Sequence, residues 1–146
     1  MANRPEALET MLHVGLLSEA IRVEGTIQQY IVNASGLLAD AKRKENSLHG
    51  RFICAYEAVH CLAMAFFRHH WCRFDGEGHR QRALQTFVQQ IGLNQAFSTI
   101  DRAHRIRNEK TYHEPTPPVD PAIIDGLILF LEQALPLMRQ LTFEAP

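Results

Sequence analysis

The sequence predicts an all-α fold, an up-and-down bundle of four to five helices. Two observations support this prediction: apolar residues recur at helical spacing along most of the chain, and no segment alternates apolar and polar residues as strands do. The chain has 146 residues, of which 46% are hydrophobic and 21% are charged, which is typical of a folded globular protein. This length favours one domain, residues 1–146.

The first half of the chain predicts a short helix and two long ones. Residues 1–22 contain the short helix, within PEALETMLHVGLL, and an amphipathic helix follows from Thr26 until the polar stretch DAKRKEN closes it. The next segment is apolar on almost every side between Phe52 and Phe67. A helix of that kind packs against several neighbours, so we expect it at the centre of the bundle. The glycine-containing stretch FDGEGH then predicts a turn.

Two more helices complete the predicted core, residues 23–113. One carries the apolar set of ALQTFVQQI and ends at Gly92. The other runs from about Asn94 and should stop near Tyr112 or His113, because Pro115 disfavours helical geometry in the residue before it.

The last predicted helix covers residues 120–142. Asp120 can cap its first amides, and Pro121 suits the first helical position. Pro136 lacks an amide donor and crowds the preceding turn, so we expect a kink or an end near Leu135. The apolar stripe of this helix is broad enough to serve both the core and a partner chain.

Charge and cysteine content point to a reduced cytoplasmic protein without a membrane partner. The formal net charge of −1 gives no global attraction to nucleic acid or to anionic lipid, so such contacts would need a local patch. Three cysteines, Cys54, Cys61 and Cys72, show no paired-motif spacing, which argues against a disulfide framework. Cys54 and Cys61 lie in an apolar stretch, so we expect them to be buried free thiols. We expect no signal segment, and no apolar run approaches the roughly 20 residues of a bilayer span.

The stretch HRIRNEKTYHEP is the first candidate site. His104, Arg107, Asn108 and Thr111 are spaced i, i+3, i+4 and i+7, so one helix face carries a base, a cation and an amide. These groups suit RNA cleavage by 2′-hydroxyl attack: histidine transfers a proton, arginine stabilises charge on phosphorus, and asparagine orients the substrate. The alternative is a solvated helix end, where the helix dipole favours cations in any case.

A second candidate is the basic segment after the central helix, in which Trp71 lies among arginines and histidines. It could follow a phosphate backbone while Trp71 stacks on a base. The alternative is a polar helix end with Trp71 closing the core. We expect no metal or cofactor, because the spacing of His69, His70, Cys72 and His79 matches no standard zinc motif.

The order of these features resembles the HEPN family (higher eukaryotes and prokaryotes nucleotide-binding). The resemblance lies in LLADAKRKENSLHGRFICAYEAVHCLAMAFFRHH, GEGHRQRALQTFVQQIGL and IDRAHRIRNEKTYH, roughly residues 37–113. It implies a small helical domain in a two-fold homodimer whose cleft cleaves RNA without a metal. It also implies a toxin of a toxin-antitoxin or phage-defence system, with a nucleotidyltransferase antitoxin as the cognate partner.

The resemblance assigns roles to individual residues of the motif. Family members share an arginine, a polar residue and a histidine, which here implies Arg107, Asn108 and His113 as the catalytic set. The remaining members would bind the ligand: His104, Arg105, Lys110 and Tyr112. Because Tyr112 holds the position of the usual histidine, a non-catalytic dimer that binds nucleotide, nucleic acid or a partner nucleotidyltransferase is the alternative. A plain helical interaction module is a third reading.

Overall fold

The computed structural model describes residues 4–74, 77–109 and 118–143. Six α-helices, one 3-10 helix and one pair of very short strands make up this part of the chain. In order, they are α1 (Glu6–His13), β1 (Ser18–Glu19), α2 (Glu24–Lys42), α3 (Leu48–His69), β2 (Cys72–Arg73), α4 (Glu77–Gln90), η1 (Asn94–Ala96), α5 (Phe97–Glu109) and α6 (Pro121–Phe143). The all-α prediction is confirmed, with the antiparallel β1–β2 pair as an addition to it.

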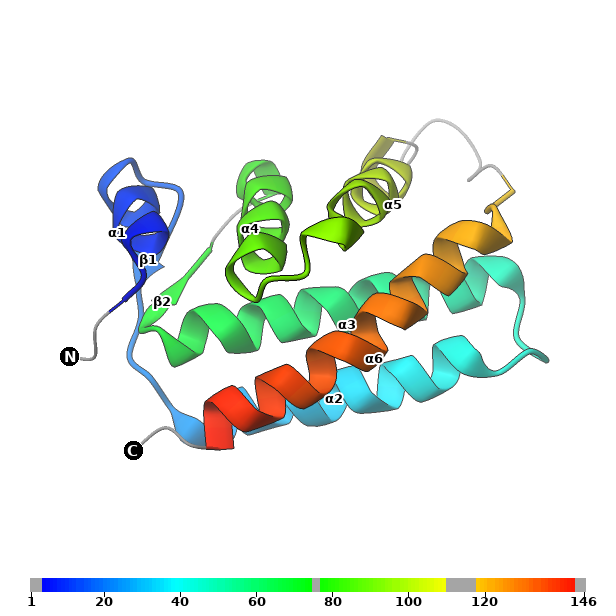
Figure 1. The fold of residues 1–146 in the computed structure, drawn as a ribbon, viewed down its shortest axis with the longest axis horizontal. Coiled ribbons are helices and arrows are strands. Elements are labelled where there is room, and N and C mark those ends of the chain that lie inside the picture. The colour runs from blue at the N-terminus through cyan, green and yellow to red at the C-terminus, as the bar shows by residue number, and fades with distance from the viewer. Residues whose placement is uncertain (1–3, 75–76, 110–117, 144–146) are drawn as a thin grey trace.

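The three long helices form one layer, and the shorter helices cross it on one side (Figure 1). α2 packs along α3, α6 packs against both, and α4 and α5 pack on α3. α1 and the last turn of α6 lie at one end of the molecule, whereas α5 lies toward the other end (Figure 1). The candidate motif on α5 is therefore remote from the N-terminal helix.

α3 is the central helix, as its sequence predicted. Ser47 caps it by accepting a hydrogen bond from the Gly50 amide at 3.0 Å. Ten of its side chains are buried, among them Phe52, Tyr56 and Phe67, which are fully buried. Burial on this scale stabilises each large side chain by about 1.5–3 kcal/mol relative to exposure, so α3 holds the other helices together.

α5 is fixed to the core through one face and through a close helix contact. Ile100 and Ala103 are buried. Gly126 allows α6 to approach α5 closely, since a Cβ atom at that position would lie 2.9 Å from Thr99 Cγ2. Apolar packing against the long helices is therefore enough to position the backbone of α5, without its polar contacts.

Three local expectations need correction. Of the expected kink or end near Leu135, the end does not occur: α6 continues to Phe143, and Pro136 lies on its exposed side, where water can hydrate the carbonyl that loses its partner. α4 begins at Glu77, so part of the expected turn FDGEGH is helical. Cys54 and Cys61 are free thiols but only half-buried, since both lie at the edge of the buried face of α3, whereas Cys72 is buried.

Two helices, α3 and α6, are long and apolar enough to cross a membrane by length and composition alone. Both also contribute buried faces to the common core. The core helix of a globular protein passes the same test of length and composition, so this finding is weak evidence for a membrane span.

Candidate functional site

A chain of polar side chains connects the middle of α3 to the last turn of α5. Tyr56 Oη lies 3.0 Å from His104 Nδ1, and His104 Nε2 lies 3.0 Å from Asn108 Nδ2. Tyr56 and His104 are buried, whereas Asn108 is exposed. The chain therefore leads from the core to the surface, and each ring nitrogen of His104 has a hydrogen-bond partner.

The partners of His104 define its protonation state. An amide nitrogen carries only hydrogens, so Asn108 Nδ2 donates and His104 Nε2 accepts. The ring is then neutral with its proton on Nδ1, from which it donates to the Tyr56 oxygen. Burial lowers the pKa of His104 below 6.5, and the positive charge of Arg80 on α4 lowers it further. Geometry and electrostatics thus agree on a neutral imidazole.

Arg80 lies beside the same network. Burial raises the pKa of Tyr56 above 10.0, and the nearby Arg80 opposes that shift through a hydrogen bond and its charge. Burial also lowers the pKa of His60 on α3 to about 4, again with a contribution from Arg80. One arginine therefore acts on three aromatic side chains at the junction of α3, α4 and α5.

Arg107 presents a partly exposed cation next to this network. Its side chain is 34% exposed, and Arg107 Nε lies 3.9 Å from the Glu57 carboxylate of α3. That separation is long for an ion pair, and Nε itself is buried without a hydrogen-bond partner among the described residues. A guanidinium carries five donors, so one loose contact leaves most of its hydrogen-bonding capacity for an anionic ligand.

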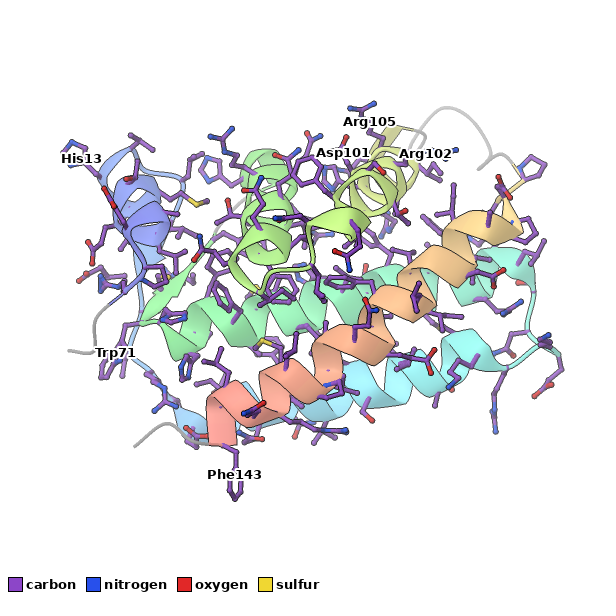
Figure 2. All side chains as sticks on the ribbon, viewed as in Figure 1. His13, Trp71, Asp101, Arg102, Arg105 and Phe143 are labelled. Atoms are coloured by element: carbon purple, nitrogen blue, oxygen red, sulfur yellow. The ribbon has the colours of Figure 1, made fainter. Side chains whose placement is uncertain are left out.

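Arg105, a predicted ligand-binding residue, forms an ion pair within α5. It pairs with Asp101 at 2.7 Å, and Asp101 also accepts hydrogen bonds from Gln81 and Gln85 of α4. The Gln81 hydrogen bond is the largest cause of the lowered pKa of Asp101. Figure 2 shows Asp101 and Arg105 on the side of α5 that faces away from the long helices. Asp101 joins α5 to α4 through these contacts, and its negative charge also acts on His104.

The structure brings some predicted site residues together. His104 and Asn108 share a hydrogen bond, and Arg107 directly precedes Asn108 in α5. The alternative of a solvated helix end does not hold for His104, because α5 turns this residue toward Tyr56 and buries it. The other predicted residues, Lys110, Thr111, Tyr112 and His113, lie outside the described residues.

The basic segment around Trp71, the second candidate, is split between the end of α3 and the Tyr56 network. His69 and His70 are half-buried at the end of α3 with ring centroids 4.9 Å apart, and burial lowers the pKa of His70 to about 4. Trp71 adopts φ 61°, a left-handed conformation that is uncommon for a bulky residue. Arg80 instead points toward the Tyr56 network. No group of three His, Cys, Asp or Glu side chains that could hold a metal occurs in the described ranges.

Sequence reasoning missed the α3 side of the site. Tyr56 and Glu57 were assigned no site role, although they are polar residues within the mostly apolar middle of α3. That interruption of the apolar pattern was the available signal, because a buried polar side chain needs a partner from another element. The partner could not be identified, since the packing of α5 against α3 depends on tertiary structure.

A comparison of the chain with protein-family models, curated proteins and solved structures gave no match. The fold and the site define a mostly helical protein with a buried tyrosine, histidine and asparagine network next to a surface arginine. Membership of the HEPN family stays a prediction from the sequence motifs.

Proposed function

We propose that the protein is a HEPN-type ribonuclease of a toxin-antitoxin or phage-defence system, acting as a homodimer in the cytoplasm. Arg107 would bind the scissile phosphate, Asn108 would orient the substrate, and His113 would transfer protons. The cognate partner would be a nucleotidyltransferase antitoxin. The proposal combines the resemblance in the sequence with the chemistry available at the end of α5.

The reaction would be an internal transesterification that requires no metal. The ribose 2′-oxygen forms a bond to phosphorus, and the bond from phosphorus to the 5′-oxygen of the next nucleotide breaks. The 2′-hydroxyl proton passes to a base, and the departing 5′-oxygen takes up a proton. Arg107 would stabilise the negative charge that develops on the phosphoryl oxygens.

The observation that carries the proposal is the arrangement of Asn108 and Arg107 at the end of α5. The Asn108 amide lies 3.0 Å from the buried His104, and Arg107, the residue before Asn108 in α5, has a partly exposed side chain near Glu57. A hydrogen-bonded amide next to a cation has the preorganisation that phosphate chemistry requires. A merely solvated helix end would not need a buried histidine and tyrosine behind it.

The test is RNA cleavage by the purified protein and its Arg107→Ala variant. We expect cleavage of single-stranded RNA or tRNA by the wild type, and a loss of about 100-fold or more in Arg107→Ala. Arg102→Ala is the matched control, because Arg102 is an exposed arginine of the same helix. Intact RNA with the wild type, together with unchanged growth inhibition by Arg107→Ala in cells, would refute the proposal.

The second candidate function is a non-catalytic dimer that binds nucleic acid, a nucleotide or a partner enzyme. The structure offers one observation in its favour: both ring nitrogens of His104 are engaged in a buried network, so this histidine is a poor substitute for a catalytic base. The binder predicts association that weakens with salt and with Arg107→Ala, but no cleavage product.

A further inference from the structure

α3 is buried on most of its circumference but has one partly exposed stripe, which we call the α3 stripe. Successive residues of an α-helix are rotated by about 100°, so the partly exposed positions from 53 to 68 fall within a sector of about 120°. Two other helices border this sector: the charge of Asp40 on α2 acts on Cys54, and Arg107 of α5 lies near Glu57. The members of the α3 stripe are Ile53, Cys54, Glu57, His60, Cys61, Met64 and Arg68.

The α3 stripe has the composition of a protein–protein interface. Methionine and arginine are enriched at interfaces, and partly exposed apolar groups are stabilised when a partner removes them from water. The stripe extends over about four turns of α3, which is long enough to pack against another helix. Its apolar members pack on the edge of the core and remain partly exposed: Ile53, Cys54, Cys61 and Met64.

The two oppositely charged residues of the α3 stripe lack close partners. Arg68 has no counterion among the described residues, and its Nε is buried without a hydrogen-bond partner there. The Glu57 carboxylate has only the contact of 3.9 Å with Arg107 Nε. Glu57 and Arg68 lie about 16 Å apart along the helix, at a rise of about 1.5 Å per residue, so they cannot pair within one chain. A closer ion pair for either residue therefore needs a second chain.

The order of residues makes the α3 stripe complementary to itself. Glu57 precedes Cys61 by four residues, and Arg68 follows Met64 by four residues. When two α3 helices pack antiparallel about a two-fold axis between Cys61 and Met64, each Cys61 lies opposite Met64 of the other copy. Each Glu57 then lies opposite Arg68 of the other copy. A two-fold contact pairs one surface with itself, so both ion pairs form together.

We propose that the α3 stripe binds the α3 stripe of a second copy of this chain in antiparallel orientation, with Glu57 of each copy paired to Arg68 of the other. The inference specifies the surface of the homodimer in the proposed function and rests on that dimer, but it does not require RNA cleavage. Glu57 also contacts Arg107 of its own chain. The contact therefore brings an arginine of the second copy next to the candidate site on α5.

Charge reversal tests the two ion pairs. Sedimentation velocity of the full chain over a range of concentrations gives the dissociation constant of the dimer. Arg68→Glu and Glu57→Arg should each weaken the dimer at least about tenfold, because each places like charges together twice. The double variant Glu57→Arg, Arg68→Glu exchanges the charges and should restore the wild-type constant to within about threefold. Since the two positions cannot meet within one chain, recovery requires contact between copies.

The matched control for charge reversal is Arg102→Glu. Arg102 is an exposed arginine of α5 outside the α3 stripe, and Figure 2 shows it beside Asp101 and Arg105. This variant changes the net charge as Arg68→Glu does, and it should leave the dissociation constant unchanged. Circular dichroism melts confirm that every variant is folded.

A disulfide tests the register without any change of charge. Met64→Cys places a thiol opposite Cys61 of the second copy, and a disulfide forms when the two Cα atoms lie about 4.4–6.8 Å apart. Oxidation of this variant should give a covalent dimer on a non-reducing gel, linked between positions 61 and 64 in peptide mass spectra. The double variant Cys61→Ser, Met64→Cys retains Cys54 and Cys72 but lacks the opposing thiol, and it should stay largely uncrosslinked.

Three results would overturn the inference, and they differ in meaning. A dimer that tolerates both charge reversals, or that gives no disulfide between positions 61 and 64 in Met64→Cys, would refute the α3 stripe as its interface. Failure of the double charge variant to recover would refute the pairing of Glu57 with Arg68. Each of these results leaves the homodimer and the ribonuclease standing. A chain that stays monomeric refutes the inference together with the homodimer of the proposed function, while the RNA cleavage assay tests the ribonuclease separately.

Discussion

Replacement of Gly126 by alanine tests the close contact of α6 with α5, which positions the candidate site. The same replacement at Gly36 is the matched control, because both glycines lie inside long helices. A Cβ atom at Gly36 meets nothing within 4 Å, whereas at Gly126 it would lie 2.9 Å from Thr99 Cγ2. The two variants therefore share the gain in helix propensity and differ in packing.

The expected free energies follow from these two terms. Alanine is favoured over glycine in a helix interior by about 1 kcal/mol, so Gly36→Ala should be stabilising by about that amount. Overpacking costs about 1–3 kcal/mol, and the side chain of Thr99 is branched at Cβ and cannot easily rotate away. Gly126→Ala should therefore range from neutral to about 2 kcal/mol destabilising.

Urea unfolding followed by circular dichroism gives the free energy of unfolding of both variants. The values can be compared if the free energy falls with urea concentration at the same slope in each variant. Thr99→Ser removes the methyl group that the new Cβ meets, so the double variant Thr99→Ser, Gly126→Ala should recover about 1–2 kcal/mol relative to additivity. If Gly126→Ala is as stabilising as Gly36→Ala and shows no coupling to Thr99, the reasoning about the α5–α6 contact is wrong.

Two further predictions concern pH and the contact between α4 and α5. The pKa of His60 and that of His70 are each lowered from 6.5 to about 4 in the folded chain. Between these pH values the unfolded chain binds more protons than the folded chain. The free energy of unfolding should therefore fall as the pH drops from about 6.5 to 4. The pKa difference sets a ceiling of about 3 kcal/mol per histidine, which partial solvent exposure reduces to about 1–2 kcal/mol. Urea titrations at about pH 7 and 4.5 measure this loss of stability, and His60→Gln should remove the part that His60 contributes. An unchanged pH dependence in His60→Gln would contradict the lowered pKa of His60. Asp101→Ala should lower the free energy of unfolding by about 1–2 kcal/mol, because it leaves Gln81 and Gln85 without their shared acceptor. Hydrogen exchange of the α4 amides should accelerate in this variant, and equal protection would show that the contact is dispensable.

The sequence was sufficient for the helices whose apolar residues recur in long, regular patterns. α2, α3 and α6 were anticipated because each has a buried face long enough to set a helical period. The β1–β2 pair was not, since two residues per strand carry no alternation. For Pro136 the sequence left a kink or an end of α6 open, because the cost of a proline depends on whether its side of the helix faces water.

The candidate site was only half accessible to sequence reasoning. Helical spacing alone places His104 and Asn108 one turn apart, and they do form a hydrogen bond. Spacing could not show that Tyr56, 48 positions earlier in the chain, would be the second partner of His104. That pairing arises from the packing of α5 on α3, and it buries His104.

The placement of the ends of the fold has a practical consequence for the experiments on this protein. α1 and the last turn of α6 lie at the same end of the molecule, while α5 lies toward the other (Figure 1). An affinity tag or a fluorescent protein fused at either terminus would therefore be held away from Arg107 and Asn108. The full chain can be immobilised or labelled for binding measurements without obstructing the surface on which RNA is expected to bind.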